Sequence, residues 1–173
     1  MINLRAGLVL LLSAGLAISC ATDQTGGGGT VEVSYQSPDQ FTDMGRSYTA
    51  LQGADPGYLN DLREYIERAG SQRVRAGYRL SLTITDVDLA GQFEPEHGPQ
   101  FQDVRIVRSI YPPRITLNYR LMDSTGAVRS QGERRLIDNS FEFTATPINR
   151  DDPLRYEKAL IDSFLREMAN QSR

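Results

Sequence analysis

The chain has 173 residues, of which 39% are hydrophobic and 24% are charged, and its formal net charge is −3. This size fits one ordinary globular domain and leaves little room for a second. The single Cys excludes a disulfide within the chain, and one Cys with one His excludes every zinc site built from these two residue types alone. The acidic balance argues against a nucleic-acid-binding protein, which normally has a basic face.

The N-terminal residues 1–19 have the pattern of a secretory signal peptide. Arg5 provides a positive charge, and a short apolar run at residues 6–18 follows it. A membrane-spanning helix needs roughly 20 apolar residues, which is more than this run contains. We therefore expect residues 1–19 to direct export and to be removed.

The signal ends at a candidate lipidation site. The segment 16–20, LAISC, resembles the lipobox of bacterial lipoproteins, in which the Cys carries acyl chains such as palmitate and becomes the mature N-terminus. Acylation of Cys20 would also remove the only thiol, which would be reactive in an oxidising compartment. In such families Ala21, rather than Asp, implies the outer membrane, with the domain in the periplasm. The alternative is a soluble periplasmic or secreted protein that is cut after Ser19 or Ala21.

Residues 20–30 are expected to form the lipidated Cys and a flexible tether. Consecutive glycines at 26–29 lie in a stretch without any apolar pattern. No strand precedes this run and no Lys or helix start follows it, so it is not a phosphate-binding loop. The folded domain is then expected to extend from residue 31 to residue 173.

The first part of this domain predicts a strand, a connection and a helix. Residues 31–35 alternate between apolar and polar, as a half-buried strand does. Residues 40–54 show no period and are expected to form a surface connection. Asp55 and Pro56 are typical of an N-cap and a first helical position. The apolar stripe that follows comprises Tyr58, Leu59, Leu62, Tyr65, Ile66 and Ala69.

The middle of the domain predicts a run of strands. Residues 78–85 alternate strictly, and the phase changes after Thr85, which indicates a bulge or a bend. A loop at 91–102 leads to a short edge strand at 104–107. Strands at 114–121 and 127–137 form a hairpin around the turn at 123–126, with a bulge expected at Gly132.

The last element is a helix that is expected to begin at the acid–acid–Pro run 151–153. Lys158, Asp162 and Arg166 are spaced to pair along its outer face. Its apolar face comprises Tyr156, Leu160, Ile161, Phe164, Leu165 and Met168. Since strands separated by turns favour an antiparallel sheet, the sequence predicts a single α+β domain. We expect a sheet of about four to five antiparallel strands with two amphipathic helices on one face.

Four segments carry a resemblance to a known family: 41–43 (FTD), 85–91 (TDVDLAG), 113–119 (PRITLNY) and 132–138 (GERRLID). They resemble proteobacterial envelope proteins of the family classed as domain of unknown function three thousand and sixteen. The most distinctive segment is 85–91, and the resemblance extends over about residues 31–168. It implies an envelope location and a single domain. Because no activity is assigned to that family, it implies no catalytic residue.

The densest polar cluster lies at residues 86–97 and contains Asp86, Asp88, Glu94, Glu96 and His97. Asp86 and Asp88 would share one face of a strand, where close carboxylates either bind a cation or raise a pKa for acid–base chemistry. We therefore take Asp86, Asp88, Glu94 and His97 as functional candidates. The alternative is structural: these carboxylates end a strand and pair with some of the many arginines of the chain.

Several kinds of chemistry are not expected. His97 is the only His available for a nucleophilic triad, and the chain has no Gly-x-Ser-x-Gly elbow for a Ser hydrolase. A Cys hydrolase fails because Cys20 is lipidated or removed. Residues 86–97 also fall short of a calcium loop, because Ala90 and His97 occupy positions that need oxygen ligands. We expect no metal site and no cofactor, while two-carboxylate glycosidase chemistry stays open.

The sequence thus favours a non-enzymatic envelope lipoprotein, in which a tethered domain binds a partner. The expected partners are the membrane, through the lipid anchor, and an envelope protein, but no nucleic acid. The alternative is a carboxylate- or metal-dependent hydrolase that acts on an envelope polymer. A deep cavity with converging carboxylates would favour the hydrolase, and a flat patch would favour the binding module.

Overall fold

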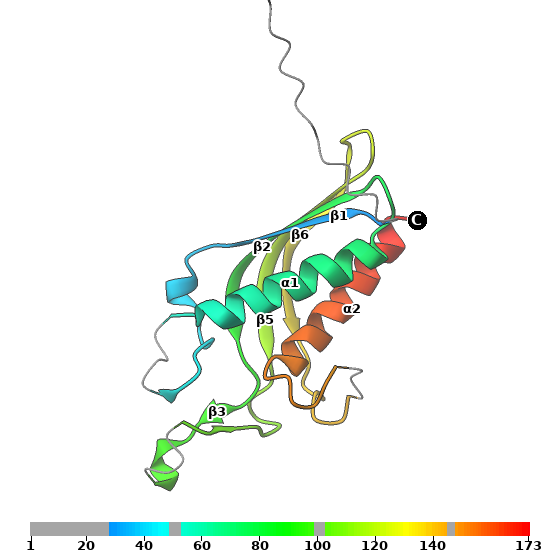
Figure 1. Ribbon diagram of the computed structural model, residues 1–173. Helices are drawn as coiled ribbons and strands as arrows, with labels where there is room; N and C mark the ends of the chain where they lie inside the picture. The colour runs from blue at the N-terminus through cyan, green and yellow to red at the C-terminus, as the bar shows by residue number, and fades with distance from the viewer. Residues whose placement is uncertain (1–27, 49–52, 99–102, 145–147) are drawn as a thin grey trace, which may run out of the picture.

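The computed structural model describes residues 28–48, 53–98, 103–144 and 148–173 (Figure 1). The predicted signal peptide at 1–19, the lipidation site Cys20 and most of the predicted tether lie outside these residues. Within them, no helix has the length and apolar character needed to cross a membrane.

Four strands form the main sheet in the spatial order β1-β2-β5-β6. They are β1 (Thr30–Tyr35), β2 (Arg79–Asp88), β5 (Arg114–Met122) and β6 (Val128–Ile137). The pairs β2–β5 and β5–β6 are antiparallel as predicted, but β1 is parallel to β2. The prediction of an antiparallel sheet is therefore wrong at β1. A helix connects β1 to β2 and returns the chain to the end of the sheet where β1 began, so β2 runs in the same direction.

Two helices, α1 (Pro56–Arg73) and α2 (Arg155–Gln171), cover one face of this sheet (Figure 1). The predicted α+β class is thereby confirmed. Both predicted stripes supply the core, since Leu62 and Ile66 of α1 and Ile161 and Leu165 of α2 are fully buried. Alternate residues of each strand point to the opposite face, which carries mostly polar side chains.

The two helices begin differently. α1 begins as predicted, because the side chain of Asp55 accepts a hydrogen bond from the amide of Tyr58 (3.0 Å). The predicted start of α2 at 151–153 is too early. The side chain of Asp152 accepts a hydrogen bond from the amide of Leu154 (2.8 Å) and closes a turn, so that the helix begins at Arg155.

The side-chain pairs predicted for the outer face of α2 are also wrong. Asp162 does not pair with Lys158 or Arg166, because it is buried between the helices. It accepts a hydrogen bond from the hydroxyl of Tyr65 (2.8 Å) and pairs with Arg73 (3.2 Å), both on α1. Asp162 therefore lies on the side of α2 that packs against α1, and not on its outer face.

One of the two predicted bulges is present. The register of β2 against β5 shifts between Ile84 and Asp86, where the apolar phase changes. The bulge predicted at Gly132 is wrong, because Gly132 pairs regularly with Tyr119. The irregularity of β6 lies opposite Leu121 and Met122, beside the hairpin turn, where turn geometry commonly leaves an extra residue.

Between β2 and β5 the chain leaves the main sheet in an excursion, residues 89–113. In it, β3 (Gln92–Phe93) and β4 (Arg105–Ile106) form a separate antiparallel pair, and a 3-10 turn, η3 (Pro95–His97), follows β3. The edge strand predicted at 104–107 exists only as β4 and does not join the main sheet. Since β2 and β5 pair directly with each other, the sheet offers no free edge between them.

The connection between β1 and α1 contributes to the core, so the prediction of a surface connection at residues 40–54 is wrong for its first part. After a 3-10 turn, η1 (Pro38–Gln40), the side chains of Phe41 and Met44 are buried in the core. The backbone of Asp43 donates to Val87 O (3.0 Å) and accepts from Leu89 N (3.0 Å). These bonds hold Asp43 beside the end of β2, next to the excursion.

The main sheet has two distinct ends. At the tether end, where β1 begins, Gly29 N donates to Val74 O (2.7 Å) and Thr30 N to Tyr78 O (2.9 Å), so these residues of the predicted tether already belong to the fold. At the far end, β2 stops at Asp88 and both helices begin (Figure 1). The ten residues of β2 separate the two ends by about 30 Å, at about 3.3 Å per residue.

Candidate functional site

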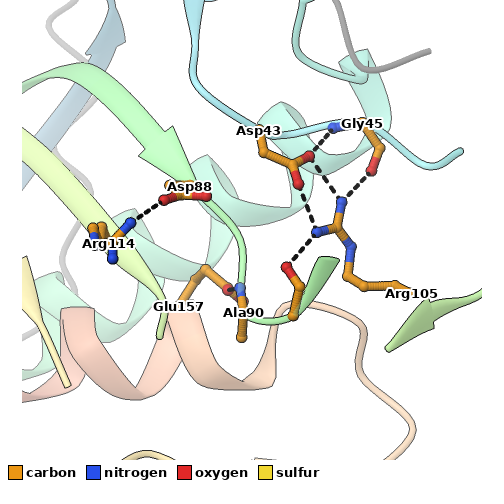
Figure 2. Close-up of polar contacts among 8 residues, drawn as sticks. Asp43, Gly45, Asp88, Ala90, Arg105, Arg114 and Glu157 are labelled. Carbon is orange, nitrogen blue, oxygen red and sulfur yellow. Dashed lines mark hydrogen bonds and ion pairs between the residues drawn. The ribbon is translucent and has the colours of Figure 1, made fainter. Parts of the chain in front are cut away.

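An ion pair between the buried Asp43 and the half-buried Arg105 links the segments of the far end (Figure 2). Arg105 of β4 donates from Nη1 to Asp43 Oδ2 (2.7 Å) and from Nη2 to Asp43 Oδ1 (2.8 Å), a bidentate arrangement. The same nitrogens donate to Gly91 O (3.0 Å) and Gly45 O (3.1 Å). Arg105 thus links the excursion, the end of β2 and the β1–α1 connection. Its Nη groups donate to protein acceptors.

Asp86 and Asp88 are bonded to different partners. The carboxylate of Asp86 accepts hydrogen bonds from Thr42 N (2.8 Å) and Thr42 Oγ1 (3.0 Å). Asp88 Oδ2 accepts from Arg114 Nη1 (2.7 Å), as Figure 2 shows. Of these two carboxylates, Asp88 pairs with an arginine, as the structural alternative expected, whereas Asp86 is bonded to Thr42.

The remaining predicted candidates lie on the excursion. Glu94 is buried and forms an ion pair with Arg108 (2.9 Å). Glu96 is exposed in η3, and the side chain of His97, in the same turn, lies outside the described structure. Over the described ranges, no group of three or more His, Cys, Asp or Glu is placed to hold a metal ion.

A polar cavity of about 300 Å³ opens beside the Asp88–Arg114 pair. The pKa of the Asp88 carboxyl is raised, chiefly by burial, while Arg114 acts to lower it and the neighbouring charges of Asp43 and Asp86 act to raise it. Asp88 is therefore the carboxyl of this cavity with acid–base potential, whereas Asp43 is fixed by Arg105. The lining comprises Thr42, Asp43, Asp88, Leu89, Gly91, Gln92, Ile110, Tyr111, Pro112 and Arg114.

A second cavity, of about 250 Å³, contains Arg105 in its lining, so the Asp43–Arg105 pair stands between the two. We call it the arginine cavity, because three arginines line it and each stacks on an aromatic ring. The stacked pairs are Arg46 over Tyr58 (4.4 Å to the ring centre), Arg105 over Phe93 (4.4 Å) and Arg155 over Tyr156 (4.3 Å). Stacking occupies the face of a guanidinium and leaves its in-plane N–H groups available for hydrogen bonds.

The carboxyl of Glu157 is buried next to the arginine cavity. Its Oε1 accepts a hydrogen bond from the amide of Ala90 (2.7 Å), a lining residue, and its Oε2 has no hydrogen-bond partner among the described residues. Burial raises the pKa of Glu157 to about 7, although the Ala90 bond and two nearby arginines act in the other direction. Sequence reasoning missed this residue. Its burial could have been predicted from its spacing, because Glu157 stands one turn before Ile161 and two turns before Phe164 on the apolar stripe.

These features define a single α+β domain with a main sheet and two covering helices, and the polar cavity and the arginine cavity lie at the far end of that sheet. Arg155 and Tyr156 also line a neighbouring cavity of about 440 Å³. The model of the family described as "Protein of unknown function (DUF3016)" matches residues 29–167, and the chain belongs to this family. The resemblance noted in the sequence is thereby confirmed. A search of curated proteins finds no match to the chain.

Two solved structures show a low-level likeness to the chain. One is a dodecamer of a point variant of PelC from Paraburkholderia phytofirmans, with 15% identity, a TM-score of 0.39, and coverage of 84% of this chain and 88% of that chain. The other is a PelC dodecamer from the same organism in a different space group, with 17% identity, a TM-score of 0.37, and coverage of 81% and 87%. A likeness of this size carries no inference about function or assembly.

Proposed function

We propose that this protein is a lipid-anchored binding module of the bacterial cell envelope, with Cys20 in the outer membrane and the domain in the periplasm. The observation that carries the proposal is the division of the domain into two ends. The tether joins the fold at Gly29, whereas both cavities lie at the far end, about 30 Å away along β2. A module anchored in this way presents its cavities away from the membrane.

The pairing of the acidic residues supports binding rather than hydrolysis. In the polar cavity, Asp43 has both oxygens bonded to Arg105, and Asp88 is paired with Arg114. Two-carboxylate hydrolysis needs one group free to act as a base or nucleophile and one free to donate a proton. A fixed bidentate partner opposes both roles for Asp43. The exposed side chain of Ile110 on the rim of the same cavity suits contact with a partner.

The lipid anchor is tested by mass spectrometry of the membrane-extracted protein. We expect an acylated Cys20 at the mature N-terminus, and we expect Cys20→Ser to release the protein or to leave it unprocessed. A wild-type protein that is soluble and begins at Thr22 would refute the anchor.

Partner binding at the far end is tested by photocrosslinking in cells. A photoreactive residue replaces Ile110, at the far end, or Val128, which is also exposed but lies at the tether end. We expect a specific crosslinked product from position 110 and none from position 128. Products from position 128 alone, or from neither position, would contradict the proposal.

The alternative of a carboxylate-dependent hydrolase has one observation in its favour, the raised pKa of Asp88 inside a cavity. If the hydrolase alternative is correct, the wild type should hydrolyse an envelope polymer and Asp88→Asn should not. Asp88→Asn should still give the crosslinked product at position 110. Hydrolysis that persists in Asp88→Asn would exclude this residue as its acid.

A further inference from the structure

The arginine cavity contains hydrogen-bond donors that the fold uses only in part. Arg46 pairs through Nε with Asp55 (2.8 Å), and no described residue accepts a hydrogen bond from its Nη groups. Arg155 donates from Nη1 to Asp152 O and from Nη2 to Tyr156 Oη, both at 3.3 Å, near the long limit of a hydrogen bond. The described part of the chain gives Arg155 no carboxylate partner within ion-pair distance. Two stacked guanidinium groups therefore keep donors for a ligand.

Both helices direct their N-termini to this cavity. Tyr58 in the first turn of α1, and Arg155 and Tyr156 in the first turn of α2, belong to its lining. The N-terminus of α1 is capped by Asp55, whereas that of α2 has no side-chain cap. Since a helix N-terminus carries a positive partial charge and free N–H groups, α2 adds to the potential of the arginines.

Glu157 places a buried carboxyl directly behind the lining of this cavity. Its Oε2 is buried and unpartnered within the described structure, and its other oxygen bonds the backbone of Ala90 in the cavity lining. With its pKa raised to about 7 by burial, the carboxyl carries little negative charge below that pH, and it then repels an anion in the neighbouring cavity only weakly.

We infer that the arginine cavity binds the oxyanion of a small ligand, a carboxylate or a phosphate group carried on one sugar-sized ring. The inference rests on the proposed function, because it names the ligand class of the far end. The planar edge of a guanidinium matches both oxyanions, and stacking fixes Arg46 and Arg155 before the ligand arrives. A volume of about 250 Å³ lies at the low end of ligand sites and has room for a single ring.

Calorimetric titration of the full chain in detergent tests this inference with three probes that share one ring: glucose 6-phosphate, glucuronate and neutral glucose. We expect one or both anions to bind and glucose not to bind. The tighter anion distinguishes a phosphate from a carboxylate ligand. Arg46→Gln and Arg155→Gln should each weaken binding at least about tenfold, as expected for the loss of a charge-assisted hydrogen bond.

Further variants separate a binding role from a structural one. Arg155→Lys keeps the charge without the planar fork and should bind with intermediate affinity. Asp103→Asn, which removes an exposed carboxylate from the lining, should tighten binding. Arg129→Gln, at the tether end, should have no effect. Each variant must retain the cooperative thermal unfolding of the wild type, which shows that it is folded.

The inference is overturned if neither anion binds the folded wild type, if glucose binds as tightly, or if Arg46→Gln and Arg155→Gln bind like the wild type. Photocrosslinking at position 110 distinguishes this failure from failure of the proposed function. If the crosslinks persist but no anion binds, the proposed binding function is retained and only the anion site is refuted. If neither crosslinks at position 110 nor anion binding is observed, both proposals are refuted.

Discussion

Replacement of Glu157 by Gln should remove a pH dependence from the stability of the domain. Burial raises the pKa of this carboxyl from 4.5 to about 7 in the folded chain. Between these two pH values the native state binds a proton that the unfolded chain has released, so the free energy of unfolding falls as the pH rises. At about 1.36 kcal/mol per pKa unit, the loss amounts to about 3 kcal/mol by pH 7. Gln keeps the acceptor for Ala90 N and never ionises.

Urea unfolding of wild type and Glu157→Gln at intervals from pH 4 to pH 8 measures this effect. The difference between the two free energies of unfolding cancels the other titrating groups and should change by about 3 kcal/mol in favour of Gln between pH 4.5 and 7. It should be constant below and above this window. Glu133→Gln, on exposed β6, is the control and should show no such change. A constant difference for Glu157→Gln would refute the reasoning, because it would mean that Arg105 and Arg155 keep the buried carboxylate ionised.

Three further predictions follow from the packing. Arg105→Ala should destabilise the domain by about 3–5 kcal/mol in urea unfolding, because it leaves Asp43 buried without its partner; a loss below about 1 kcal/mol would contradict the clamp. Gly29→Ala should cost about 1–3 kcal/mol, since a Cβ there would lie 2.6 Å from Val74 Cγ1. Gly132→Ala should stay within about 0.5 kcal/mol, because the added Cβ would lie 3.7 Å from Tyr119 Cε1, an ordinary contact distance; equal losses in the two variants would disprove the close packing of Gly29. Calorimetry should show no heat with micromolar calcium, because Thr42 and Arg114 already occupy the Asp86 and Asp88 carboxylates; tight binding that Asp86→Asn abolishes would overturn this expectation.

The sequence by itself determined the elements of the fold, because these follow from local rules. Alternation in residues 31–35 and 78–85 predicted β1 and β2, and the loss of phase after Thr85 predicted the register shift there. The pairing of Asp55 with Pro56 predicted the start of α1. Hydrophobic periodicity and capping act over a few residues, so the sequence alone records them.

Contacts between distant segments were decided only by the tertiary structure. β1 is parallel to β2 because α1 returns the chain to the end of the sheet where β1 began. β4 pairs with β3 outside the main sheet because β2 and β5 pair directly with each other. The same holds for the site, since Asp43 and Arg105 meet across 62 residues and Ala90 and Glu157 across 67. The predicted cluster at 86–97 lay close in sequence, but folding gave its carboxylates separate partners, Thr42, Arg114 and Arg108. The partner of a buried charge is set by which distant segments pack against it, so a local sequence pattern does not predict that partner.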